Sequence, residues 1–526
     1  MRGRRWPWAA AAVVVVLVAV AVGVLLRGGP TPSGTSSQLP PLAEPTLRPG
    51  DPSTDPAYST YYRQHPRWMS CRQHAKCTRV TVPVDWDDPA AGSIELAVAR
   101  LPATKPGERI GSLVLNPGGP GGSGADYVGD YGEYVTTPDV RARYDIVGFD
   151  PRGVGQSHPV DCLSDRAMDR YLAFDADPDT PGGLQAMRQE ADRFAGGCLA
   201  SAGSLLGHVD TISAAKDMDV LRAVLGDKRL NYLGKSYGTL LGATYAGEYP
   251  GRVGRMVLDG ALDPASSHDD VVLGQAVGMQ QALRAYVADC QAGEQKQQCP
   301  LPGDVAAGEK RVRQLLDDAD RSPLRTSDPA RPVTASLALN GVIQPLYDDR
   351  SWPELTAALS SAFSGDGTKL LALADQYAQR GPDGSYDGNL LEVFNAVTCL
   401  DYPMNDDPAA MHALEQRLVA ASPTFGSYLA YGEVLCGEWP VTPVRTPAPI
   451  RADGAPPILV VGTTGDPATP YRWAQALARE LKSGRLLTWD GEGHTAYLRG
   501  SQCVDGAVDR YLLDGELPGE GAACSR

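Results

Sequence analysis

The sequence predicts an α/β fold, in which helices cover both faces of a mostly parallel sheet and a large helical cap is inserted. Apolar runs that end in Gly, Asp or Asn recur at 111–119, 144–153, 229–236, 253–260, 456–466 and 484–494. Such continuous runs are typical of strands buried on both faces, as in parallel sheets. Helical stretches separate the runs, and one amphipathic region is long enough to be a domain in itself.

The N-terminus predicts export. Three arginines within the first five residues precede an apolar run at 9–26, and a basic segment before an apolar one is typical of signal peptides. The run is about 18 residues long, which suits either a cleaved signal or a membrane anchor. We therefore interpret residues 1–27 as a signal peptide or membrane anchor. The protein is expected to be secreted or bound to the cell envelope, in the second case through residues 9–26.

The rest of the chain divides into four segments. Residues 28–57 are rich in Pro, Ser, Thr and Gly and predict a disordered linker. Residues 58–262 and 446–526 hold the predicted strands and form the two parts of the sheet domain, the first opening with a hairpin at 78–101. Residues 263–445 predict a helical cap over the edge where parallel strands end, which is the edge where ligands bind in such sheets.

Charge and composition exclude some classes of function. The chain has 526 residues and a net charge of −15, with 43% hydrophobic and 21% charged residues. This composition is typical of globular proteins and allows a sizeable core. Binding of nucleic acid requires a basic surface that neutralises phosphates. We therefore expect a globular protein that does not bind nucleic acid.

Ten cysteines fit an exported chain. They include no Cys-x-x-Cys pair, so neither a zinc site nor a thioredoxin-type site is expected. Spacing alone leaves many pairings open. We favour disulfides between sequential neighbours, each of which would stabilise the fold by about 2–4 kcal/mol. The favoured pairs are Cys71 with Cys77, Cys162 with Cys198, Cys290 with Cys299, Cys399 with Cys436, and Cys503 with Cys524.

One serine lies in a pattern typical of nucleophiles. Gly234-Lys235-Ser236-Tyr237-Gly238 follows a predicted strand and begins a predicted helix. A sharp turn between strand and helix needs small flanking residues and leaves the serine hydroxyl accessible. The N–H groups at the helix N-terminus can stabilise a developing oxyanion. We predict that Ser236 is a catalytic nucleophile, with a plain small-residue turn as the alternative.

A serine nucleophile needs a histidine base, and that base needs an acid to orient it. In this architecture the chain order is serine, acid, histidine. His494 follows the last long apolar run, within a glycine-rich loop, and is the predicted base. Asp466 follows the preceding run and is the predicted acid, with Asp259 as its rival.

The oxyanion requires two backbone donors. The residue after the nucleophile, Tyr237, supplies one of them. The glycine-rich segment 116–124 follows a predicted strand and is expected to supply the second, from Gly119 or alternatively Gly118. This segment lacks the lysine and hydroxyl residue of a phosphate-binding loop. We expect no metal and no cofactor.

Six motifs, in this order, carry a resemblance: NPGGPGGSG, GFDPRGVGQS, NYLGKSYGTLLGATYA, VLDGALDP, GTTGDPATP and GEGHTAY. They resemble the secreted tripeptidyl aminopeptidase family, which consists of α/β-hydrolase serine peptidases related to prolyl iminopeptidase. The resemblance implies an α/β-hydrolase core with a helical cap, and the release of short peptides from free N-termini. The family's nucleophile, acid and base match Ser236, Asp466 and His494. Its oxyanion loop matches 118–121, although Asn116-Pro117 stand where iminopeptidases usually have histidine.

Carboxylates in the cap are candidates for binding the cationic amine of a peptide. Asp401 lies near Cys399 and Glu433 lies near Cys436; the alternative is that both are solvated carboxylates. The sequence thus predicts an exported serine exopeptidase that forms an acyl-enzyme on Ser236 and acts on peptide substrates. A carboxylesterase or lipase-like hydrolase with the same catalytic residues is the alternative. We expect a monomer.

Overall fold

The computed structural model describes residues 37–38, 47 and 51–525, with the exception of 73, 179, 294 and 295. The predicted signal or anchor segment, 1–27, and most of the predicted linker lie outside the described residues. Within the described part of the chain, no helix combines the length and the apolar character needed to cross a bilayer.

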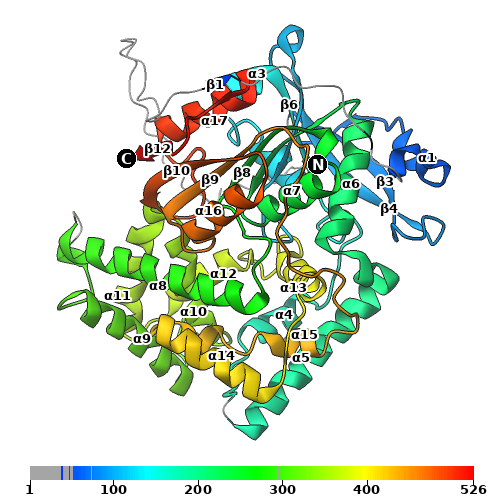
Figure 1. The fold of residues 1–526 in the computed structure, drawn as a ribbon. Helices are drawn as coiled ribbons and strands as arrows, with labels where there is room; N and C mark the ends of the chain where they lie inside the picture. Colours follow the sequence, from blue (N-terminus) through cyan, green and yellow to red (C-terminus); the bar gives the residue numbers. More distant parts are fainter. Residues whose placement is uncertain are drawn as a thin grey trace, which may run out of the picture.

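A ten-stranded sheet forms the centre of the upper half of the molecule in Figure 1. In spatial order its strands are β12 (Ala523–Ser525), β10 (Gly484–Glu492), β9 (Ile458–Gly465), β8 (Val253–Asp259), β7 (Leu230–Lys235), β5 (Gly111–Asn116), β6 (Tyr144–Phe149), β4 (Ser93–Leu101), β3 (Lys76–Pro83) and β2 (Met69–Ser70). Neighbours are parallel from β12 to β6 and antiparallel from β6 to β2. A separate pair joins β1 (Ser37–Gln38) to β11 (Glu516–Leu517). The predicted fold class is confirmed.

Helices cover both faces of the sheet. One face carries α1 (Ser59–Tyr62), α6 (Thr211–Val224), α7 (Tyr237–Glu248) and α16 (Tyr471–Glu480), and the other carries α2 (Gly124–Tyr131), α3 (Pro138–Arg143) and α17 (Gln502–Asp514). Alternate strand residues serve the two faces: Val114 packs in the cluster with α6 and α7, while Leu113 and Leu115 pack in the cluster with α2 and α17. All residues of β5 and β6 are buried. This burial on both faces explains the continuous apolar runs of the sequence.

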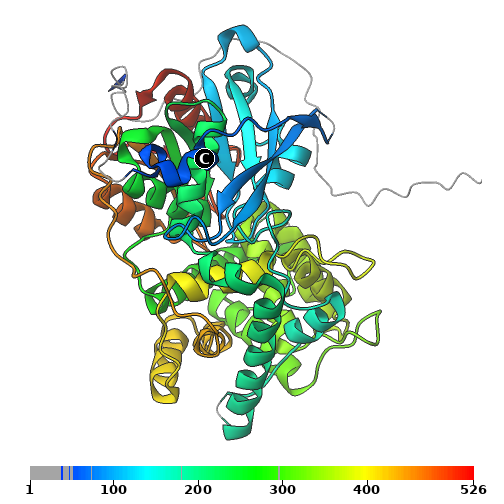
Figure 2. The same ribbon diagram turned by 90° about the vertical axis from the view of Figure 1, so that its right-hand side faces the viewer.

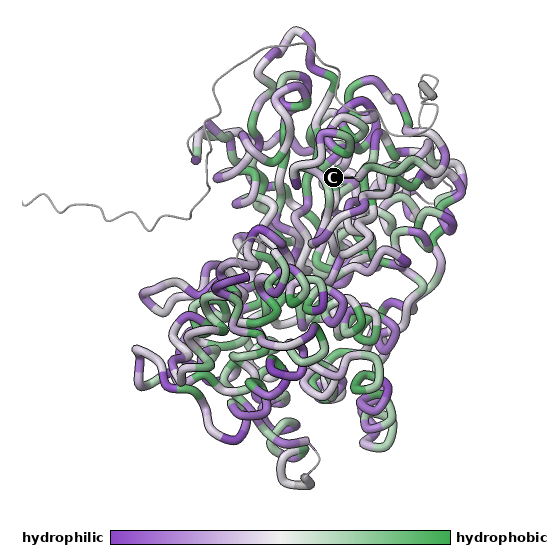
Figure 3. Tube along the Cα trace, turned by 90° about the vertical axis from the view of Figure 1, so that its left-hand side faces the viewer, coloured by the Kyte–Doolittle hydropathy of each residue, from purple (hydrophilic) through white to green (hydrophobic). Residues whose placement is uncertain are grey.

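The cap lies below the sheet domain in Figure 1. Its helices are α8 (His268–Ala292), α9 (Val305–Arg321), α10 (Ala335–Ile343), α11 (Trp352–Phe363), α12 (Thr368–Tyr377), α13 (Leu390–Asp401), α14 (Pro408–Ala421) and α15 (Glu433–Gly437). The cap has its own buried cluster, which includes Leu283, Val312 and Leu359. Figure 3 shows hydrophobic residues inside both parts of the molecule.

A second insertion also belongs to the cap layer. Helices α4 (Asp165–Leu172) and α5 (Pro181–Ala202) lie with the cap helices in Figures 1 and 2. Arg188 of α5 pairs with Asp406 at 2.7 Å, and Asp169 of α4 pairs with Arg380 at 2.6 Å. The expected boundaries placed this segment in the sheet domain, with the rest of 58–262. In the structure, these ion pairs attach it to the cap instead.

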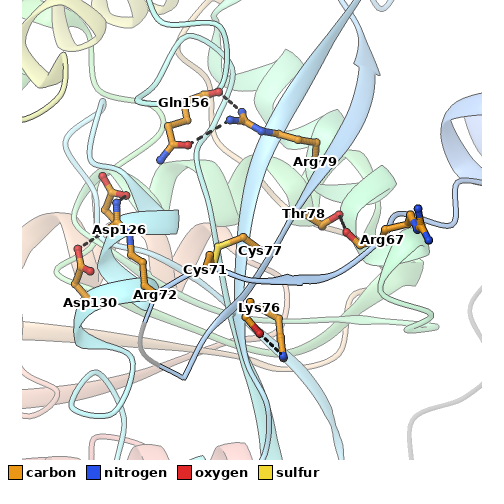
Figure 4. Close-up of a disulfide and its surroundings, with 11 residues drawn as sticks. Arg67, Cys71, Arg72, Lys76, Cys77, Thr78, Arg79, Asp126, Asp130 and Gln156 are labelled. Atoms are coloured by element: carbon orange, nitrogen blue, oxygen red, sulfur yellow. Dashed lines mark hydrogen bonds and ion pairs between the residues drawn. A yellow bond between two sulfur atoms is a disulfide. The ribbon is translucent and has the colours of Figure 1, made fainter.

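The five predicted disulfides are present and use all ten cysteines: Cys71–Cys77, Cys162–Cys198, Cys290–Cys299, Cys399–Cys436 and Cys503–Cys524. Figure 4 shows the first of them beside β3. Within its small loop, Arg72 reaches over to α2, where it pairs with Asp126 at 2.6 Å and with Asp130. The disulfide loop is thereby attached to the helix that follows the glycine-rich segment.

Regular structure is already described before residue 57, where the predicted linker ends. Two 3-10 turns cover Pro52–Thr54 and Pro56–Tyr58. Asp51 is buried and accepts a hydrogen bond from Arg252 at 2.7 Å, and Arg252 also pairs with Asp219. A buried guanidinium requires a counter-charge. Asp51 supplies one to Arg252, and their ion pair attaches the end of the predicted linker to the sheet domain.

Candidate active site

Ser236 lies in the turn between β7 and α7. Its backbone has φ 56° and ψ −125°, a conformation that is strained for a residue other than glycine. The N–H of Ser236 donates to the carbonyl oxygen of Asp259 at 2.9 Å, which fixes the turn on β8. A Cβ on Gly234 would lie 2.3 Å from the carbonyl oxygen of Gly238, and a Cβ on Gly238 would lie 2.8 Å from Oδ1 of Asn116. Close packing therefore requires both glycines of the motif.

His494 and Asp466 form a pair in which the carboxylate is buried and the imidazole is partly buried. The imidazole Nδ1 lies 2.9 Å and 3.0 Å from the two carboxylate oxygens. Asp466 is 3% exposed and accepts hydrogen bonds from the N–H groups of Ala468, Thr469 and Thr495. The Thr469 hydroxyl donates to the same carboxylate at 3.0 Å and lies 3.3 Å from Nδ1. The carboxylate is thus fixed in place and orients the imidazole.

The turn after β8 connects the serine with the histidine. The carbonyl of Asp259 accepts the Ser236 N–H, and the next residue, Gly260, packs against the imidazole. A Cβ on Gly260 would lie 3.2 Å from Cε1 of His494. Ser236 and His494 therefore contact adjacent residues of one turn at the carboxyl end of the sheet.

Asp259, the rival acid, has a different partner. Its carboxylate is fully buried and accepts the N–H groups of Ala496 (2.9 Å) and Tyr497 (3.0 Å). Burial raises the pKa of Asp259. The hydrogen bonds fix the loop that follows His494. The structure places Asp466, and not Asp259, at hydrogen-bonding distance from the imidazole.

The cap contacts the same histidine. The N–H of His494 donates to the carbonyl oxygen of Tyr347 at 2.8 Å. The two rings meet edge to face, with centroids 5.5 Å apart. Tyr347 follows α10 in the cap, so the position of the imidazole depends on both parts of the molecule.

The glycine-rich loop after β5 lies against the serine. A Cβ on Gly118 would lie 2.8 Å from Cβ of Ser236 and 3.4 Å from the backbone nitrogen of Tyr237. Gly118 and Gly119 have φ angles of 104° and 113°, which favour glycine. The N–H of Gly118 donates to Oδ1 of Asn116 at 3.0 Å. The loop thus approaches Ser236 closely, and one of its two candidate donors is already hydrogen-bonded.

Asp401 occupies a position that the sequence did not predict. It is 1% exposed, and its Oδ1 accepts the N–H of Thr211 at 3.0 Å while the other oxygen accepts the Thr211 hydroxyl. Burial raises the pKa of Asp401 to about 6. A role in binding a substrate amine does not fit this position, because the carboxylate is almost fully buried and is hydrogen-bonded to Thr211 of the sheet domain.

Glu433, the other predicted substrate-binding residue, is buried at the start of α15. Its Oε1 lies 3.2 Å from Nδ1 of His268, and no hydrogen-bond partner for Oε2 lies among the described residues. His268, Asp269 and Glu433 are the one group in the described chain whose potential ligand atoms all lie within 4.8 Å of one another. Asp269, however, is exposed and pairs with Arg417 at 3.4 Å.

Several residues around the site escaped the sequence analysis. Thr469 stands three residues after Asp466, a local spacing that could have indicated a contact. Thr211 begins α6, and only its place after a capping aspartate distinguishes it. Tyr347 and His268 carry no local signal, because tertiary packing of the cap alone brings them near the other site residues.

A serine on a strained strand-to-helix turn, an oriented His–Asp pair and a glycine loop beside the serine define a serine hydrolase of the α/β-hydrolase fold. The family model described as TAP-like protein matches residues 422–524. The chain is 40% identical over 485 residues to serine protease Hip1 of Mycobacterium tuberculosis, covering 87% of this chain and 90% of the relative.

Two further relatives extend the match. Carboxylesterase B of Mycobacterium tuberculosis is 40% identical over 522 residues, with 96% of each chain covered. Tripeptidyl aminopeptidase of Streptomyces lividans is 32% identical over 466 residues, covering 86% of this chain and 83% of the relative. The chain belongs to the tripeptidyl-aminopeptidase-like family of α/β-hydrolase serine peptidases, as the sequence motifs indicated.

Proposed function

We propose that this serine peptidase cleaves peptide bonds near free N-termini and forms its acyl-enzyme on Ser236. The observation that carries the proposal is the His494–Asp466 pair, held at 2.9 Å beside the turn that fixes the serine. Two relatives named as a serine protease and a tripeptidyl aminopeptidase support a peptide substrate.

The chemistry follows from the geometry. The Ser236 hydroxyl attacks the substrate carbonyl while Nε2 of His494 accepts its proton, and Asp466 stabilises the imidazolium that forms. The N–H groups of Tyr237 and Gly119 stabilise the oxyanion. Gly119 is the better candidate because the N–H of Gly118 already donates to Asn116. His494 then protonates the leaving amine and activates the water that releases the acyl group.

Glu433 is the proposed receptor for the substrate's N-terminal amine. Its side chain is buried beside His268, and its Oε2 has no hydrogen-bond partner within the described structure. An ammonium group would satisfy that oxygen through a charge-assisted hydrogen bond. Replacement of Glu433 by Gln is expected to raise KM for peptides with a free amine and to leave KM for N-acetylated peptides unchanged. Glu438, on the other side of Cys436, pairs with Arg188 and provides the matched Gln variant.

An esterase is the second candidate, because one relative is named as a carboxylesterase. The experiment compares turnover of tripeptide p-nitroanilides with free and acetylated N-termini, and of short-chain p-nitrophenyl esters. Preference for the free peptides supports the exopeptidase, whereas ester turnover without peptide turnover contradicts it. Ser236→Ala is expected to abolish all three activities, which excludes a contaminating enzyme.

Export is proposed on the same footing. The five disulfides fit an oxidising compartment, where such bonds form and persist. Fractionation of cells that express the full chain would separate released protein from protein anchored through residues 9–26. Recovery of the full chain from the cytosol would contradict the proposal.

A further inference from the structure

Helix α13 of the cap contacts the glycine loop of the candidate oxyanion hole through Leu390 at its start, and reaches Tyr237 through Thr211 at its end. We infer that α13 positions the two oxyanion donors, with Asp401 as the positioning residue for Tyr237 and the Asn389–Leu390 segment as the support of the Gly119 loop. The inference rests on the proposed catalytic role of Ser236. It assigns to Asp401 a part in transition-state stabilisation instead of substrate binding.

The C-terminal end of α13 reaches the donor at Tyr237. Asp401 accepts both the N–H and the hydroxyl of Thr211. Because the Thr211 hydroxyl donates to Asp401, its oxygen accepts the hydroxyl of Tyr237, at 2.7 Å. All three side chains are buried. This chain of hydrogen bonds fixes the Tyr237 ring, and with it the residue whose N–H faces the oxyanion.

The N-terminal end of α13 is bonded to the segment that follows β6. Asn389 is buried, and its Nδ2 donates to the carbonyl oxygens of Gly153 (2.8 Å) and Val160 (3.1 Å). Its Oδ1 accepts the N–H of Gly155 at 2.9 Å. These bonds attach the start of the helix to the sheet domain.

The neighbouring Leu390 contacts the glycine loop directly. A Cβ on Gly121 would lie 2.5 Å from the Leu390 carbonyl oxygen, and a Cβ on Gly119 would lie 3.3 Å from its Cδ1. The loop that carries the second donor therefore lies directly against the cap helix. A displacement of α13 relative to the sheet would move both donors away from the reacting carbonyl.

The helix is also linked to the proposed amine receptor. The disulfide Cys399–Cys436 joins the last turn of α13 to α15, the helix that begins at Glu433. A substrate amine held at Glu433 would therefore be coupled to the helix that positions the donors. Binding and transition-state stabilisation would share one rigid unit.

The test replaces Asp401 by Asn and Thr211 by Val or Ser. Loss of one oxyanion donor lowers kcat by about 10²–10³, and a displaced donor should cost about tenfold to a hundredfold. We expect this loss for Asp401→Asn and Thr211→Val, with KM unchanged, while Thr211→Ser keeps its hydroxyl and the wild-type kcat. Asp175 accepts the N–H of Ala335 at the start of α10 in the cap. Its Asn variant is the matched control, for which we expect an unchanged kcat.

A second readout separates positioning from general damage. A peptide boronic acid mimics the tetrahedral adduct, whereas the tripeptide product mimics the ground state. Asp401→Asn and Thr211→Val should weaken boronate binding by the same factor by which they lower kcat/KM, and should leave product binding unchanged. Equal weakening of both ligands, or an unchanged kcat in both variants, would overturn the inference. If Asp401→Asn does not fold, the Val and Ser variants of Thr211 still decide it.

The proposed function can fail separately. Ester hydrolysis requires the same oxyanion hole, so the variants are also assayed on p-nitrophenyl esters. If the wild type cleaves esters and no peptides, the exopeptidase proposal fails. A loss of ester kcat in Asp401→Asn would still support the role of α13, and an unchanged ester kcat would refute it.

Discussion

Replacement of Asp259 by Asn distinguishes two roles for this carboxylate: support of the loop that follows His494, and orientation of the imidazole. The buried carboxylate accepts the N–H groups of Ala496 and Tyr497. An amide keeps one acceptor oxygen, so one buried N–H loses its partner, at a cost of about 1–3 kcal/mol. The free energy of unfolding should fall by that amount. Displacement of the neighbouring His494 by about 1 Å should lower kcat by up to about a hundredfold.

The comparison variant is Asp466→Asn, whose carboxylate contacts the imidazole. Loss of the orienting acid costs about 10⁴ in kcat with little change of structure. Asp227 accepts the N–H of Ser112, and burial raises its pKa as well. Its Asn variant therefore controls for the loss of a structural carboxylate. The assay measures urea unfolding midpoints and ester kcat for all three variants. A 10⁴-fold loss in Asp259→Asn without loss of stability would refute the assignment.

Three further predictions follow from the same contacts. Gly118→Ala should lower kcat by at least about a hundredfold in steady-state assays, because its Cβ would lie 2.8 Å from Cβ of Ser236. Burial raises the pKa of Asp401 to about 6. The resulting contribution to the stability of the folded state is complete below about pH 4 and is lost as the pH rises to 6. In urea unfolding, the free energy of unfolding of the wild type should therefore fall by about 3 kcal/mol relative to that of Asp401→Asn over that interval. Removal of Cys503–Cys524 should lower stability by about 3 kcal/mol in thermal unfolding without changing kcat at 25 °C.

The sheet and the sharp turn that carries Ser236 were predictable because their sequence signals are local. The apolar runs reflect burial on both faces, and Gly234 and Gly238 reflect close packing within a few residues of Ser236. The chain order of serine, acid and histidine then pointed to Asp466 and His494. The disulfides join the sequential neighbours that we favoured, although the spacing of the cysteines alone left other pairings open.

The cap was predictable only in outline. Its attachment to α4 and α5 depends on ion pairs such as Arg380–Asp169, which join residues more than two hundred positions apart. The position of Asp401 depends on Thr211, 190 residues away. Hydrophobic periodicity carries no information about such contacts, so the place of Asp401 near Cys399 gave no sign of its contact with Thr211.

The arrangement of the sheet explains why so much of the site depends on one edge. In the order β10, β9, β8, β7 and β5, adjacent parallel strands lead at their carboxyl ends to His494, Asp466, Asp259, Ser236 and the Gly118 loop. Parallel register brings these groups together without any loop crossing the sheet. The strands cannot, however, hold the glycine loop and the Tyr237 ring against an incoming substrate from outside the sheet. Leu390 of α13 supplies the contact to the glycine loop directly, and Asp401 at the other end of α13 supports the Tyr237 ring through Thr211.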